Sequence, residues 1–107
     1  MNETITAVRL GGTASGKTIS RTEFGTIRQE TCAGVPIGLY VIGRNGYRIA
    51  ELERTFDGWE LRIGDRADMD AGLSLLGTFP GRLDALRALV QHELPASRVD
   101  YVTVNNA

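Results

Sequence analysis

Two turn dipeptides constrain the middle of this sequence more than any other feature. Asn45-Gly46 and Asp57-Gly58 each join a residue that tolerates positive φ to a glycine, and apolar residues recur on both sides of them. The first dipeptide predicts a type I′ turn, and the two together predict successive β-hairpins. Strands joined by such short turns must be antiparallel, so the core of the fold is predicted to be an antiparallel sheet.

The two strands around the second turn differ in regularity. The later strand alternates strictly, with Trp59, Leu61 and Ile63 on one face and Glu60 and Arg62 on the other. In the earlier strand the parity slips, because Tyr47 and Ile49 share one face while Ala50, Leu52 and Phe56 share the other. A β-bulge near residues 50–51 would reconcile the two halves.

The remaining elements follow from composition and periodicity. β-Branched residues predict strands at 3–10 and 99–104, an extended segment at 18–31, and a short strand at 73–79. The apolar run at 39–42 predicts a strand buried on both faces. Residues 81–94 predict an amphipathic helix that begins after Pro80 and ends before Pro95, with an apolar stripe of Leu83, Leu86, Val90 and Leu94.

Length and charge limit the fold and the function. A chain of 107 residues with 42% hydrophobic residues is long enough for a single domain, 1–107, of the α+β class. We expect an antiparallel sheet of five or six strands with the one helix packed on it. Thirteen acidic and twelve basic residues leave a net charge of −1, which disfavours a nonspecific binder of nucleic acid.

Cellular location follows from the start of the chain and from its apolar windows. No signal-peptide pattern opens the sequence, no apolar window is long enough to span a membrane, and the single cysteine cannot form an internal disulfide. The expected compartment is the cytoplasm, with no membrane partner.

Residues 11–18 match the phosphate-binding pattern G-x-x-x-x-G-K-[ST] through Gly11, Gly16, Lys17 and Thr18. A working phosphate loop needs a helix directly after the lysine, because the amide groups of the helix N-terminus hold the phosphates. The Thr-rich segment 18–31, interrupted by Gly25, predicts an extended chain instead. We therefore expect a hairpin loop here, and nucleotide binding is the least favoured alternative.

Other reactive side chains do not form a recognised site. Asp65, Asp68 and Asp70 lack the ligand spacing of an EF-hand and predict a solvated loop. His92 lies opposite the helical stripe and is predicted to be exposed, and Cys32 is predicted to be a partly buried small hydrophobe. We expect no catalytic residues, no metal and no cofactor, so the chain is not predicted to be an enzyme.

Residues 47–93 carry a family resemblance. "YR" at 47–48, "WELRI" at 59–63, and "LGTF" at 76–79 running into an Ala/Leu helix resemble the three-strand-plus-helix DNA-binding module of APETALA2/ethylene-response domains, also seen in the arm-binding domains of phage-type integrases. The resemblance implies that the sheet face away from the helix would meet DNA. By position that face would present Arg48, Arg54, Glu60 and Arg62, with Leu73 and Leu75 where the family has Arg and Trp.

Three functions remain open at this point. The first is a small non-catalytic interaction protein, such as a phage or bacterial accessory factor, that binds a protein partner through the sheet face or the 65–72 loop. Leu73 and Leu75 on an outer face would then be covered by residues 1–31, by a second copy in a homodimer, or by the partner. The second is a double-stranded DNA-binding module that uses Arg48, Arg54 and Arg62, and the third is nucleotide binding at 11–18.

Overall fold

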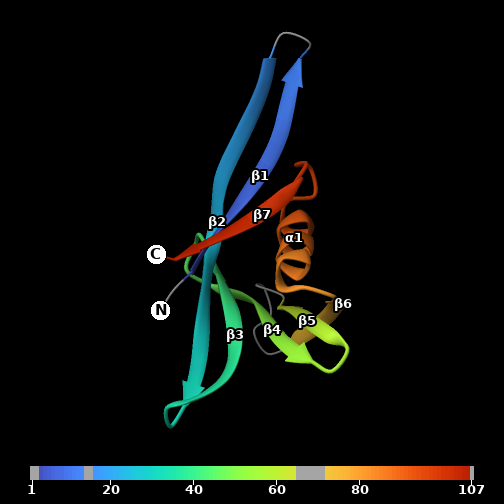
Figure 1. Cartoon of the computed structure of the whole chain (residues 1–107). Helices are drawn as coiled ribbons and strands as arrows, with labels where there is room; N and C mark the ends of the chain where they lie inside the picture. Colours follow the sequence, from blue (N-terminus) through green and yellow to red (C-terminus); the bar gives the residue numbers. More distant parts are fainter. Residues whose placement is uncertain (1–2, 14–15, 65–71, 107) are drawn as a thin grey trace.

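The computed structural model describes residues 3–13, 16–64 and 72–106 (Figure 1). Within them the chain forms seven strands and one helix, in the order β1 (Glu3–Thr13), β2 (Gly16–Cys32), β3 (Val35–Gly43), β4 (Arg48–Thr55), β5 (Gly58–Gly64), β6 (Leu73–Phe79), α1 (Arg82–Glu93) and β7 (Tyr101–Asn106). The α+β class is confirmed. The expected five or six strands are too few, because every extended segment, including 18–31, joins the one seven-stranded sheet.

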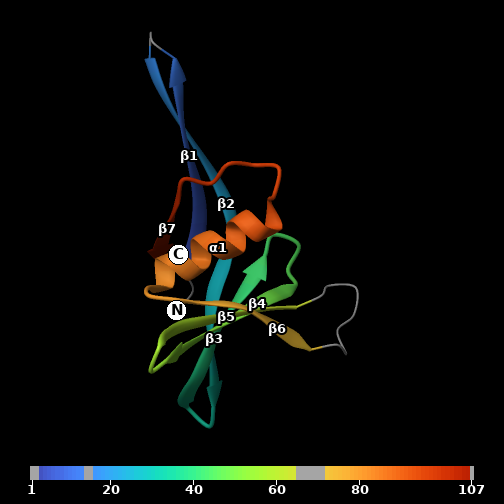
Figure 2. The same cartoon turned by 90° about the vertical axis from the view of Figure 1, so that its right-hand side faces the viewer.

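The strands form one antiparallel sheet in the order β6-β5-β4-β3-β2-β1-β7. β1 to β6 follow one another as a meander, and then α1 carries the chain across the sheet to place β7 beside β1. The helix contacts β5 and β6 from one end of the sheet and β7 from the other. The sheet therefore curls around the helix, as Figure 2 shows.

The core lies between α1 and the concave face of the sheet. The helix contributes Ala85, Leu86, Leu89 and Val90, and the strands contribute Ile5, Ile27, Val41, Ile49, Ala50, Leu52, Leu61 and Val102, all buried. The helix boundaries agree with the prediction to within one residue. The predicted stripe is partly wrong, because Leu83 is 51% and Leu94 37% exposed. Because both ends of the curled sheet contact the helix, its buried side is centred on other residues than the leucine spacing alone indicates.

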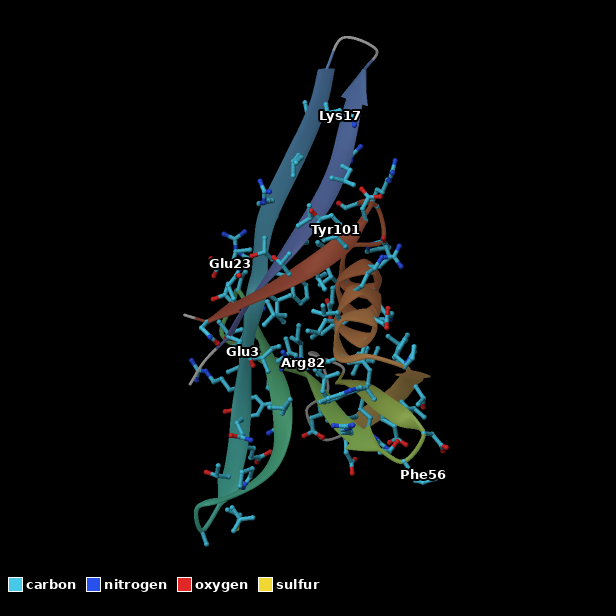
Figure 3. All side chains as sticks on the ribbon, viewed as in Figure 1. Glu3, Lys17, Glu23, Phe56, Arg82 and Tyr101 are labelled. Carbon is cyan, nitrogen blue, oxygen red and sulfur yellow. The ribbon has the colours of Figure 1, made fainter. Side chains whose placement is uncertain are left out.

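One ion pair joins the first turn of helix α1 to the first residue of strand β1. The Arg82 guanidinium donates to both carboxylate oxygens of Glu3, at 3.1 and 3.3 Å. Figure 3 shows the two side chains directed toward each other from α1 and β1. This contact joins residues from opposite ends of the chain.

Both predicted hairpins are present, but the first turn is not of the predicted type. The β3–β4 turn is closed by Gly43 N–H to the Tyr47 carbonyl and Gly46 N–H to the Gly43 carbonyl, both at 3.0 Å. Gly46 has φ of +85° and Asn45 does not have positive φ, so this is a three-residue loop and not a type I′ turn. The two-residue turn with positive φ at both positions is Ala33-Gly34, between β2 and β3.

The β4–β5 turn also departs from the prediction. Thr55 pairs with Gly58, so the loop residues are Phe56 and Asp57. Phe56 does not share a face with Ala50 and Leu52 as predicted, but lies in the loop and is fully exposed. Gly58 supplies the positive φ, at +131°.

The predicted bulge is present within one residue of its expected place. Val41 pairs with Ala50 and Ile42 with Arg48, which leaves Ile49 as the extra residue on β4. Ile49 and Ala50 are therefore both buried, as the parity slip required. In the facing strand only one side is fully buried: Val41 lies in the core, while Tyr40 and Ile42 are half-buried on the outer face. The prediction of burial on both faces is corrected accordingly.

β2 is a strand throughout, as its composition predicts. Gly25 in its middle is required by close approach, because a Cβ there would overlap the Ile42 carbonyl oxygen. Cys32, at the end of this strand, is exposed and not partly buried as expected.

Candidate interaction site on the β1–β2 arm

The sheet residues expected to bind DNA divide between two faces. Strand register places Arg48 opposite Ile42 and Arg62 opposite Glu51 and Leu75, on the outer face away from the helix. Arg54 pairs with Trp59 and alternates with Leu52, so it belongs to the concave face. The expected outward set is therefore wrong at Arg54.

Carboxylates neutralise the arginines on the outer face. Arg48 pairs with Glu30 at 3.1 Å and with Glu51, and its guanidinium lies 4.6 Å from the centre of the Tyr40 ring. This cluster leaves no excess positive charge around Arg48.

Carboxylates also neutralise Arg62, on the next strand, β5. Arg62 pairs with Glu60 at 2.7 Å and with Glu53 at 3.5 Å. With Arg28, which lies opposite Tyr40 on the same face, three arginines thus face four carboxylates across β2, β4 and β5. An outer face of this composition has no net positive field to attract phosphate.

Leu73 and Leu75 lie on the same outer face, on edge strand β6. Leu75 is 54% exposed and Leu73 half-buried. Residues 3–13 and 16–31 do not cover them, because β1 and β2 lie beyond β3 and β4 in the sheet. Coverage by the N-terminal segment of the same chain is therefore excluded for the described part of that segment.

The phosphate-loop pattern lies at the end of a β-hairpin. Gly11 pairs with Thr18, Gly12 with Lys17 and Thr13 with Gly16. Lys17 and Thr18 belong to strand β2, where a phosphate loop would have the first turn of a helix.

This hairpin extends beyond the body of the protein as a two-stranded arm, formed by residues 9–13 of β1 and 16–23 of β2 (Figure 1). β7 pairs with β1 only as far as Val8, and β3 pairs with β2 only from Gly25 onward. Among the described residues, both outer edges of the arm therefore lack a neighbouring strand. All eight residues 16–23 are exposed.

The arm is cationic and carries apolar side chains. Residues 9–22 contain Arg9, Lys17 and Arg21 and no acidic residue. Leu10 and Ile19, 43% and 52% exposed, are opposite each other in the register. Figure 3 shows Lys17 near the tip, and Glu23, the first carboxylate, at the base. Sequence reasoning missed the arm as a binding site. Its only signals were the alternation of residues 17–23 and the run of positive charge in residues 9–22, and the phosphate-loop pattern drew attention away from both.

Asp100 anchors the base of the arm. One of its carboxylate oxygens accepts the Leu10 N–H at 2.6 Å and the other accepts from Arg98 Nε at 2.8 Å, while its own N–H donates to the Val8 carbonyl at 3.0 Å. The Leu10 hydrogen bond, aided by Arg98, holds the pKa of Asp100 below its usual value of 3.8. The arm therefore leaves the body in a fixed direction.

A groove runs along the arm next to this anchor. Its volume is about 680 Å³, and its lining includes Arg9, Lys17 and Arg98 together with Thr18 and Ile19. No carboxylate lines it. Arg98 is paired with Asp100, so Arg9 and Lys17 supply the net positive charge of the groove, which suits an anionic or acidic ligand.

Conventional reactive centres are not evident in the described part of the chain. It contains no buried polar or charged residue and no group of three His, Cys, Asp or Glu side chains able to hold a metal. His92 is exposed, as predicted. Asp65, Asp68 and Asp70 lie outside the described residues, and none of the described helices is long and apolar enough to cross a membrane.

Residues 48–93 fold as three antiparallel strands and a helix, set within the larger sheet. This arrangement alone does not establish a relationship to the APETALA2-type module. No protein-family model, curated protein or solved structure matches the chain.

Proposed function

We propose that this protein is a non-catalytic interaction protein whose β1–β2 arm binds a protein partner. The observation that carries the proposal is the arm itself, which extends a strand ladder into solvent with open edges, paired apolar side chains and three cations. Open strand edges offer unpaired N–H and C=O groups to an added strand. Leu10 and Ile19 supply apolar contact, and the cations favour an acidic partner.

Double-stranded DNA is a second candidate, and the same arm supports it better than the sheet arginines do. A two-stranded ribbon fits the major groove, and residues 9–22 carry three positive charges without a carboxylate. Arg48 and Arg62, by contrast, are held by their carboxylate partners. Three charges predict weak, strongly salt-dependent binding.

Site-specific photo-crosslinking tests the first candidate. A photoreactive amino acid replaces Ile19 on the arm, or exposed His92 on α1 as the matched control, and cells that express the full chain are irradiated. We expect the Ile19 variant to give discrete protein adducts that the His92 variant lacks and that Lys17→Glu with Arg21→Glu removes. Identical adduct patterns from both positions would reject the arm as the binding element.

A DNA titration separates the second candidate from the first. The purified chain is mixed with a 20–30 base-pair duplex at about 20 mM and 200 mM salt. A shift at low salt that Arg9→Glu with Lys17→Glu abolishes would favour the DNA function. No shift at low salt would eliminate it.

A further inference from the structure

The β2 edge of the arm is complementary to itself. The Val8 carbonyl and the Leu10 N–H both point toward Asp100, on the side of β1 away from β2. Because backbone groups alternate in direction along a strand, those of Arg9, between them, point toward β2. In the register, the β2 partners of Val8 and Leu10 are Arg21 and Ile19. Residues 17, 19, 21 and 23 therefore direct their N–H and C=O groups to the open edge.

We infer that the partner of this edge is a second copy of the chain, paired antiparallel through residues 16–23 about a two-fold axis at Ser20. This inference rests on the proposed role of the arm and names its partner. In this register Lys17 faces Glu23 of the second copy at both ends of the ladder, and Ile19 faces Arg21 of the second copy. The two arms then form one four-stranded sheet.

Charge selects this register over its neighbours. Sliding one copy by two residues in one direction places Lys17 opposite Arg21, and sliding it the other way places Arg21 opposite itself. Like charges directly opposite on a sheet are destabilising. The register centred on Ser20 avoids both pairings and uses the whole open edge, which ends where β3 joins β2 at Gly25.

Apolar contact agrees with the same register. Ile19 of the two copies would be diagonal neighbours across the axis, each flanked by its own Leu10. The exposed pair of each arm would thus continue into an apolar strip across all four strands.

Charge exchange tests the inference by sedimentation equilibrium on the full chain. The wild type is expected to approach twice its mass of 11.6 kDa as concentration rises. Lys17→Glu or Glu23→Lys alone should raise the dissociation constant at least about tenfold, and the double variant, or a mixture of the two single variants, should restore association. Arg28→Glu, on the same strand beyond the open edge, should leave it unchanged.

Cysteine trapping tests the register. In a Cys32→Ser background, Ser20→Cys lies on the two-fold axis and should form an intermolecular disulfide, since directly opposed residues have suitable Cα separation. Thr18→Cys would face Thr22 of the second copy and should not. Efficient trapping at 18 but not at 20 would overturn the register.

The outcomes separate this inference from the proposed function. A wild type that stays monomeric up to about 1 mM would overturn the second-copy inference, while arm-specific crosslinks from Ile19 to another protein would leave the proposed function standing. A dimer unaffected by Lys17→Glu and Glu23→Lys would overturn this inference, and a loss of arm-specific crosslinks as well would overturn both.

Discussion

The body and the arm are built from the same two strands, β1 and β2, which are flanked and buried in the body but open-edged and exposed in the arm. In the body, β1 and β2 are flanked by β7 and β3, and Ile5 and Ile27 are buried against the helix. In the arm, the same strands continue with exposed side chains and open edges. Two-stranded ribbons are at best marginally stable alone in water. The arm thus depends on continuity with the body, on the Asp100 anchor and, in the proposal, on a partner.

Removing a core side chain should destabilise the protein far more than removing a side chain of the arm. Leu86 is fully buried in α1, so Leu86→Ala should lower the free energy of unfolding by about 3–5 kcal/mol through lost burial and a cavity. Ile19→Ala on the arm should change it by less than about 0.5 kcal/mol. Urea unfolding of both variants at concentrations below any dimerisation measures the difference. Equal losses would mean that the arm folds as part of the core.

Adding one methyl group sharpens the contrast within a single strand. Gly25→Ala places a Cβ against the Ile42 carbonyl and should cost about 1–3 kcal/mol through overpacking. Gly16→Ala, where no atom lies within 4 Å, is the matched control in the arm. Thermal and urea unfolding should find the control close to wild type. A neutral Gly25→Ala would contradict the close approach of β2 and β3.

The Glu3–Arg82 ion pair should have a smaller effect. Its side chains are 27% and 32% exposed and the contact is two-pronged, so Arg82→Ala should cost about 1 kcal/mol. A double-mutant cycle with Glu3→Gln isolates the interaction from other effects of the substitutions. A coupling energy of zero would show that the pair does not fasten α1 to β1.

The Asp100 anchor should give the most local effect. Because its folded pKa lies below the unfolded value near 3.8, its stabilisation is fully present above that value and is lost as pH falls through the folded pKa. Amide exchange at Leu10, corrected for intrinsic rates, should therefore become less protected on acidification. Asp100→Asn should reduce protection at neutral pH and remove most of this pH dependence. Unchanged Leu10 protection in that variant would contradict the anchor.

Local sequence signals predicted most of the elements but fewer of their details. Alternation identified β5, the slip in parity identified the bulge at Ile49, and the Pro80 and Pro95 boundaries identified α1. The type I′ turn predicted at Asn45-Gly46 was wrong because Asn45 permits positive φ without requiring it, and the closing hydrogen bonds decide the loop length. The helix stripe was partly wrong because burial depends on where the two ends of the sheet meet the helix.

The candidate site was harder to predict because it depends on an edge left open. Residues 17–23 alternate like any surface strand, and nothing local indicates that β3 stops pairing at Gly25 or β7 at Val8. The sequence was enough to single out Arg48, Arg54 and Arg62 through the family resemblance. The neutralisation of two of them by Glu30 and Glu53 depends on register between strands.

The sequence by itself determined the α+β class, the antiparallel strands and the extended conformation of 18–31. It did so because backbone preference and side-chain periodicity act over a few residues. Only the tertiary structure decided that β7 joins β1, that Glu30 lies beside Arg48, and that a cationic ribbon extends past the sheet. These outcomes depend on how strands far apart in sequence align, since the length of each pairing decides which backbone groups and charges remain open to a partner.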